Sequence, residues 1–300
     1  LDDSAVVKER PRYVAKLDGK GNFQFRNLAA GTFALYALPN DYSKRYDDTT
    51  KPFAFADSSI SSTQNKPLTL FAYQLPKIDT APPKSKAATA TSKAKEDKLL
   101  RFQTNLEDGK QNLLKNFTIT FNKKIGTFDS TKITLLGPDS NVVANYKVVA
   151  DTNKTKFTIL YNWPENTSYK LIMRKEAFAD TAGTTLAKND TIRFSTKREG
   201  EYGSVKVRFK NLDLTRNPVM QIVQNDKLVD SIPLSGNEWS RKLFEPGEYE
   251  IRILYDTNKN GKWDPGKFFG SHIQPEIVEM VDTKLSIRAN WDNNREITLK

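Results

Sequence analysis

Residues 248–264 read EYEIRILYDTNKNGKWD, and the two halves of this segment have different patterns. In the first half Tyr249, Ile251 and Ile253 alternate with charged residues, which predicts a β-strand with one buried face. The second half is rich in Asp, Asn and Gly, as is typical of a tight loop. The segment therefore predicts a strand that leads into a polar loop.

The loop has the spacing of an oxygen-rich cation site, with polar side chains at positions one, three, five and nine around Gly261. The candidate Ca²⁺ ligands are Asp256, Asn258, Asn260, the carbonyl of Lys262, and Asp264. Position twelve, where such loops carry a bidentate Glu, is Lys267. The alternative is a loop without metal, in which the same side chains accept hydrogen bonds from backbone N–H groups. The sequence leaves both possibilities open.

A weaker copy of the strand and its preceding turn lies near the start of the chain. Residues 21–35 read GNFQFRNLAAGTFAL, and residues 236–251 read GNEWSRKLFEPGEYEI. We expect strands around Phe23–Phe25, around Phe33–Ala37 and over residues 69–75. Three strands are few for a closed sandwich, so residues 1–75 are predicted to be the C-terminal part of a β domain with an unpaired sheet edge. The copy of the polar loop, residues 40–47, has lost the spacing and the Gly, which predicts a surface loop.

The remaining chain divides into a linker and two further β units. Residues 76–98 contain three Pro followed by Lys, Ala, Ser and Thr, which predicts a flexible linker. Residues 99–199 contain about seven short alternating segments, as expected for a β-sandwich. Residues 200–300 hold the polar loop and a late apolar alternation over 285–291. The predicted fold class is all-β, with tandem β-sandwich domains.

Composition excludes several classes of protein. The hydrophobic fraction of 37%, with 17 Phe, 11 Tyr and 4 Trp, supports globular cores and excludes a disordered chain. The absence of Cys excludes disulfides, thiolate metal sites and thiol catalysis in residues 1–300. With His272 as the one histidine, a His-based metal site or catalytic triad is not expected.

The net charge of +11 does not indicate a nucleic-acid partner. Residues 200–300 carry 15 basic and 15 acidic side chains, so the excess lies in the middle of the chain. There the cations alternate with apolar residues along predicted strands, as on a solvated sheet face, and do not gather with aromatics in one element. No phosphate-binding Gly-rich loop, zinc-binding helix motif or nucleophile elbow is present, so we do not expect an enzyme.

Short motifs carry a resemblance to known families. Residues 18–33, with DGKGNF, NL and GTF, resemble the second half of a carboxypeptidase regulatory-like, or prealbumin-like, domain. Residues 99–199 are similar to the SbsA-type bacterial Ig-like domain, through FTITF with the following NKK, NTSY, DTAG and RFST. The order of units, together with residues 256–264 and RANWD at 288–292, looks like the Ig-like-domain envelope lipoproteins of Bacteroidetes-type bacteria.

That resemblance implies an envelope protein associated with the outer membrane, either periplasmic or surface-exposed. It also implies a signal peptide and a lipid-bearing Cys upstream of Leu1, so the membrane would be reached only through that anchor. It supplies no catalytic residues. We therefore expect a non-catalytic scaffold or interaction subunit that contacts another envelope protein, with the sheet edge of residues 1–75 as the contact. The alternative is a glycan- or surface-binding module, which clustered exposed aromatics near Trp163 or Trp263 would favour.

Overall fold

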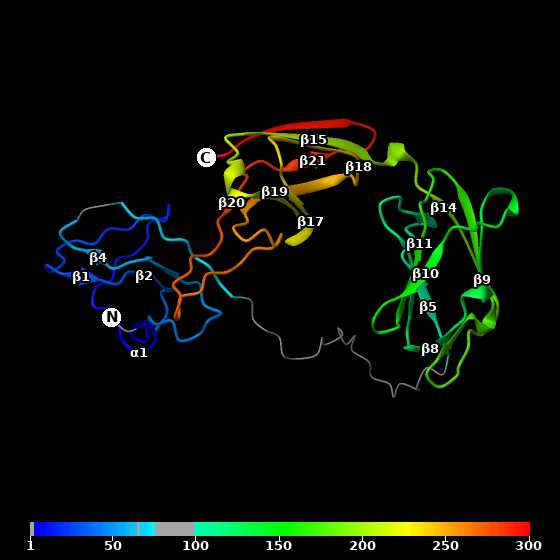
Figure 1. Ribbon diagram of the computed structural model, residues 1–300, viewed down its shortest axis with the longest axis horizontal. Helices are drawn as coiled ribbons and strands as arrows, with labels where there is room; N and C mark the ends of the chain where they lie inside the picture. Colours follow the sequence, from blue (N-terminus) through cyan, green and yellow to red (C-terminus); the bar gives the residue numbers. More distant parts are fainter. Residues whose placement is uncertain (1–2, 65–66, 76–98) are drawn as a thin grey trace.

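The computed structural model describes residues 3–64, 67–75 and 99–300, and it is almost entirely β-structure (Figure 1). Three units are present: a first unit in residues 1–75, a central unit in residues 99–199 and a third unit in residues 200–300. In space the third unit lies between the other two (Figure 1). The prediction of a flexible linker at residues 76–98 falls outside the described residues.

The third unit is a sandwich of two sheets. The smaller sheet has the order β18-β15-β22, and the larger has the order β17-β16-β19-β20, with β21 also paired to β19. Alternation along the strands places Val207, Ile222 and Ile251 between the sheets, where all three are fully buried. The strands are β15 (Gly203–Lys210), β16 (Pro218–Gln224), β17 (Lys227–Pro233), β18 (Glu238–Phe244), β19 (Gly247–Tyr255), β20 (Val278–Met280), β21 (Leu285–Ile287) and β22 (Asp292–Thr298).

The predicted strand over 285–291 is therefore wrong in its second half. The chain leaves β21 after Ile287, turns through Asn290 in a left-handed conformation (φ 56°), and begins β22 at Asp292. Trp291 is 61% exposed. Apolar alternation alone did not reveal this turn, because Ala and Trp continued the pattern across it.

The central unit is a second sandwich, built from ten short strands where about seven were expected. Its sheets have the orders β10-β11-β7-β5 and β6-β14-β12-β9, and a two-stranded ribbon pairs β13 with β8. Phe117, Ile119 and Leu171 are fully buried in its core. The strands are β5 (Phe102–Thr104), β6 (Lys110–Gln111), β7 (Phe117–Phe121), β8 (Ile125–Phe128), β9 (Ile133–Leu136), β10 (Lys147–Ala150), β11 (Lys156–Leu160), β12 (Ser168–Met173), β13 (Phe178–Asp180) and β14 (Asp190–Thr196).

The first unit is much less regular. It contains α1 (Ala5–Lys8), β1 (Thr32–Phe33), β2 (Tyr36–Ala37), β3 (Ala54–Phe55) and β4 (Ile60–Ser61), paired as β1-β4 and β2-β3. Two predicted strands do not form: residues 22–26 are in no ladder, and residues 69–75 contribute one bridge, between Tyr73 and Phe53. A strand requires a continuous hydrogen-bonded neighbour; residues 22–26 have no ladder partner, and residues 69–75 have one only at Tyr73.

Candidate functional site

The polar loop begins where β19 ends. Asp256 follows Tyr255 directly and is 2% exposed, since the strand carries it to the edge of the core. Its Oδ1 accepts a hydrogen bond from the Asn260 N–H at 3.2 Å, and its Oδ2 accepts one from the Gly261 N–H at 2.6 Å. Lys259 and Gly261 both have positive φ, 61° and 74°, which curls the backbone around this carboxylate.

The other predicted ligands close the same loop. Asn258 Oδ1 accepts from the Asn260 N–H at 3.0 Å, and Asn260 Oδ1 accepts from the Lys262 N–H at 2.7 Å. The side-chain amides of Asn258 and Asn260 both donate to Asp264 Oδ2, at 2.5 and 2.7 Å. The structure thus brings four of the five predicted residues together through their side chains, and Lys262 joins them through its backbone.

Glu276 also belongs to this loop, and sequence reasoning missed it. It is 7% exposed; its Oε1 accepts from the backbone N–H and the hydroxyl of Thr257, both at 2.7 Å, and its Oε2 accepts from the Asp264 N–H at 3.0 Å. The carboxylate that closes the loop therefore comes from beyond position twelve, where Lys267 had been noted. Its signal was weak, because a segment of 11 residues separates it from Asp264.

The chemistry of these donors suits a hard cation, which prefers carboxylate and amide oxygens. Their present orientation suits hydrogen bonding, since the amide nitrogens of Asn258 and Asn260 point toward Asp264. A bound cation would require both amides to turn. Within the described part of the chain, no group of three or more His, Cys, Asp or Glu side chains is placed to hold a metal ion.

The segment after the polar loop fastens the first unit to the third. Phe268 is 4% exposed and lies in the aromatic cluster of the first unit, with ring centroids 5.3 Å from Phe53 and 5.2 Å from Phe55. Gln274 Nε2 donates to the Phe55 carbonyl at 3.0 Å. Because residues 264–276 carry both Asp264 and Phe268, the polar loop and this interface share one segment.

His272 lies in the same interface. Its Nε2 is 2.8 Å from Asp3 Oδ1, and its ring stacks on Phe268 with centroids 4.9 Å apart. The side chain is 44% exposed and lies in a loop, although the ring makes defined contacts. Nearby, a Cβ added to Gly266 would lie 2.6 Å from the Tyr73 ring, which shows how closely the two units approach.

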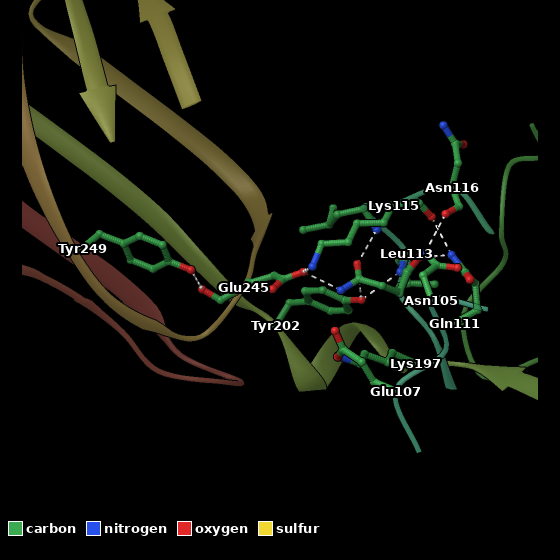
Figure 2. Close-up of polar contacts among 12 residues, drawn as sticks. Asn105, Glu107, Gln111, Leu113, Lys115, Asn116, Lys197, Tyr202, Glu245 and Tyr249 are labelled. Atoms are coloured by element: carbon green, nitrogen blue, oxygen red, sulfur yellow. Dashed lines mark hydrogen bonds and ion pairs between the residues drawn. The ribbon is translucent and has the colours of Figure 1, made fainter. Parts of the chain in front are cut away.

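A second interface joins the central unit to the third (Figure 2). The Tyr202 hydroxyl accepts from the Leu113 N–H at 2.8 Å and donates to Asn112 Oδ1 at 3.1 Å. Asn112 Nδ2 donates to Glu245 Oε1, and Lys115 Nζ lies 3.0 Å from the same oxygen. Asn112 is 4% exposed and Tyr202 2%, so these polar groups satisfy one another out of water.

Two ion pairs flank this interface. Lys110 Nζ lies 2.9 Å from Glu201 Oε1, and Lys197 Nζ lies 2.8 Å from Glu107 Oε2. The backbone N–H of Arg198 and then the Lys110 ammonium lower the pKa of Glu201. The Lys197 ammonium likewise lowers the pKa of Glu107. These pairs tie the short connection after β14 to the central unit.

The first unit contains two cavities of about 390 and 490 Å³. Tyr13, Phe25, Leu35 and Tyr36 line both of them. The central and third units bury their apolar faces in cores between two sheets, whereas the first unit has two sheets of two strands each with these cavities beside them.

The tryptophans considered for recognition are packed. Trp163 is 6% exposed in the core of the central unit. Trp263 is partly buried against the aromatic cluster of the first unit, and its Nε1 donates to the Glu276 carbonyl at 2.9 Å. Neither of these two rings is exposed to a ligand, so the two tryptophans themselves do not supply the exposed aromatics of a glycan-binding module.

Comparison with known proteins finds a match for the central part of the chain. Residues 76–196 match the family model described as a bacterial Ig-like domain. No curated protein matches the chain. Among solved structures, domains MG0-NIE-MG1 of native alpha-2-macroglobulin from Escherichia coli align with 65% of this chain and 92% of that one, at 11% identity and a TM-score of 0.29.

The N-terminal part of the bacterial S-layer protein SbsC aligns with 62% of this chain and 44% of that one, at 11% identity and a TM-score of 0.28. The Bacillus anthracis TIE protein aligns with 70% of this chain and 42% of that one, at 12% identity and a TM-score of 0.20. Scores this low carry no argument about function.

Proposed function

We propose that this protein is a non-catalytic scaffold or interaction subunit of the bacterial cell envelope that contacts another envelope protein. The observation that carries the proposal is the pair of two-stranded sheets in the first unit, β1-β4 and β2-β3, whose strands have two residues each and beside which two cavities lie. An unpaired sheet edge is a ready surface for an added strand. The Ig-like match over residues 76–196 supports a non-catalytic role.

The contacts between units support a scaffold. Phe268 fixes the first unit against the third, and the Tyr202–Asn112 contact fixes the central unit against the third. A partner bound at the first unit would therefore be held at a defined orientation to the other two. Fixed geometry of this kind is useful to a subunit that positions a partner, and it is not needed by a chain of independent modules.

Within this proposal, the first unit is the C-terminal part of a carboxypeptidase regulatory-like, or prealbumin-like, domain and the third unit is a second such domain. The protein is held at the outer membrane by a lipid anchor upstream of Leu1. These statements rest on the sequence resemblance. In residues 3–64, 67–75 and 99–300, no helix is long and apolar enough to cross a membrane.

Ca²⁺ binding at the polar loop is a second part of the proposal. The loop combines Asp256, Asp264 and two Asn amides, and it shares residues 264–276 with the interface to the first unit. A cation held there would stiffen the segment that carries Phe268. The loop would then serve to stabilise the arrangement of the units.

The interaction role is tested by chemical cross-linking in intact cells of the native host, followed by affinity purification of the tagged protein. We expect one envelope protein to be enriched, with cross-links to residues of the first unit. Recovery of the protein alone, or of partners cross-linked only to the central unit, would contradict the proposal. Fractionation of the same cells tests the location, since an envelope protein should be found in the envelope fraction and not in the cytoplasmic fraction.

A further inference from the structure

The internal repeat holds at the level of strand pairing. When Gly31 is aligned with Gly247, β1 and β2 correspond to the two halves of β19. β1 pairs with β4 in the register by which β19 pairs with β21, and β2 pairs with β3 in the register by which β19 pairs with β20. The corresponding pairs are Phe33↔Ile60 with Tyr249↔Leu285, and Tyr36↔Phe55 with Arg252↔Met280. The first unit is therefore built on the plan of the third.

The third unit has a strand, β16, in whose place the first unit has a helix. When Gly21 is aligned with Gly236, β16 corresponds to residues 3–9, which hold α1 beside the smaller cavity. On its other edge β19 pairs with β16, and β16 also pairs with β17, so β16 lies between them. Residues 218–223 of β16 are all buried. Met220 illustrates the arrangement, since it stands opposite Ile253 on one side and Ile232 on the other.

With Gly21 aligned to Gly236, one residue out of step with the Gly31–Gly247 alignment, the repeat places the counterpart of β17 at residues 12–18. This segment lies immediately before the turn in which the Asp18 N–H donates to the Asn22 carbonyl at 2.9 Å. Among the residues that the structure describes, no backbone hydrogen bond joins residues 12–18 to residues 32–38. The two cavities lie between these segments, since Tyr13 and Leu35 line both. We name this space the strand slot: the region bounded by residues 12–18 and 34–38.

The backbone of the slot is ready for pairing. The Leu35 carbonyl accepts from the Ala56 N–H at 3.0 Å, so the polar groups of Leu35 face β3. Because backbone polar groups alternate in direction along a strand, those of Ala34, Tyr36 and Leu38 face the slot. The arrangement leaves a row of backbone hydrogen-bond donors and acceptors next to apolar side chains, as on the unpaired edge of a sheet.

We infer that the strand slot binds one extended polypeptide strand that is not part of residues 1–300. It runs antiparallel to both walls, as β16 does, with apolar side chains where β16 has Met220 and Ile222. Four cations line the cavities, Arg10, Arg12, Lys16 and Lys44, against one carboxylate, Glu9. The occupant therefore carries acidic residues beside its apolar segment. This inference rests on the proposed interaction function and gives the chemistry of the partner.

The probe is a labelled synthetic peptide that copies residues 218–224 with two Glu added at each end. We expect saturable binding to the full chain, measured by fluorescence anisotropy, together with slower amide hydrogen exchange at Ala34, Tyr36 and Leu38. Ala34→Pro removes one N–H that faces the slot, and it should weaken binding at least tenfold. Ala34→Val keeps that N–H and is the matched control, expected to bind within about threefold of the native chain.

A peptide N-methylated at alternate residues repeats the test without altering the protein, in case Ala34→Pro fails to fold. Its binding should also be lost. Absence of saturable binding by the unmodified peptide at millimolar concentration would overturn the inference. The inference would also be overturned if, without peptide, the protection of these amides against hydrogen exchange rose with protein concentration. A second copy of the protein would then fill the slot. If Ala34→Pro still cross-links to an envelope partner, the proposed function stands, but the partner does not bind in the strand slot.

Discussion

At the scale of single residues, a substitution at Asp256 distinguishes two hypotheses for the polar loop: a metal site and a loop held by hydrogen bonds alone. Both of its carboxylate oxygens accept backbone N–H groups, at 3.2 and 2.6 Å. Asn at this position can accept only one of them through its side-chain carbonyl. Asp256→Asn should therefore destabilise the loop by about 1–3 kcal/mol with or without metal, so a loss of stability alone does not demonstrate Ca²⁺ binding.

The measurement that separates the two readings is the dependence of melting on Ca²⁺. If the loop binds Ca²⁺, a hundredfold excess over Kd should stabilise the full chain by about 2.7 kcal/mol relative to chelator. Asp256→Asn should abolish most of that difference. Asp282→Asn, at a side chain that is 79% exposed, is the control and should leave it unchanged. Equal melting temperatures in Ca²⁺ and in chelator for the native chain would leave the hydrogen-bonded loop as the only role.

Tyr202 gives a second prediction at this scale. Tyr202→Phe removes the hydroxyl that accepts the Leu113 N–H and donates to Asn112, leaving buried polar groups without their partner. We expect a loss of about 1–3 kcal/mol in the free energy of unfolding, measured with guanidinium chloride. Tyr42→Phe, at a side chain that is 93% exposed, should change the free energy by less than about 0.5 kcal/mol. Equal effects of the two substitutions would show that the Tyr202 hydroxyl is not structurally important.

At the scale of elements, residues 264–276 unite two roles in one loop. Phe268 is buried in the first unit, while the adjacent Phe269 is 42% exposed. Phe268→Ala should cost about 3–5 kcal/mol, because it empties the centre of an aromatic cluster. Phe269→Ala is the matched control and should cost much less.

The effect of Phe268→Ala should be local to one interface. Hydrogen exchange should accelerate in β3 and around Tyr73, while β7 of the central unit should keep its protection. Faster exchange across all three units would mean that the chain unfolds as a whole, and the loop would then have no separate role in docking the first unit.

Elements with strong alternation were predictable from sequence. The strand with Tyr249, Ile251 and Ile253 forms as expected, since each alternate side chain is buried in one core. The segment with Phe23 and Phe25 has the same alternation and forms no strand, because pairing depends on a neighbour that local sequence does not specify. The spacing of the polar loop identified Asp256 to Asp264, but Glu276 and Phe268 act through contacts that have no periodic signal.

At the scale of the whole molecule, the order of units in space differs from their order in the chain. The third unit contacts both of the others, through Phe268 on one side and Tyr202 with Glu245 on the other (Figures 1 and 2). Composition and periodicity describe each unit separately and contain no information on this arrangement. A few side chains at two small interfaces determine it.

The arrangement of the central and third units should depend on pH. The pKa values of Glu107 and Glu201 are lowered from their usual 4.5 by Lys197 and by the Arg198 N–H with Lys110. A carboxyl group with a lowered folded-state pKa contributes stability above its unfolded pKa and loses it as the pH falls through the folded value. Of the two pairs, Glu201–Lys110 joins the two units, while Glu107–Lys197 lies within the central unit next to the connection. An exposed pair contributes at most about 1 kcal/mol, so acid should loosen the interface without unfolding either unit.

Small-angle X-ray scattering at pH 7 and at about pH 3.5 measures this loosening, and circular dichroism confirms that the sheets persist. We expect a larger radius of gyration in acid. Glu201→Gln at pH 7 should reproduce part of the increase, since Gln still accepts the Arg198 N–H but no longer pairs with Lys110 as a charge. Glu296→Gln removes a charge that pairs with Lys210 on the exposed surface of the third unit, and it should have no effect. Identical scattering at both pH values would mean that the neutral contacts of Tyr202 and Asn112 hold the two units in place without the ion pairs.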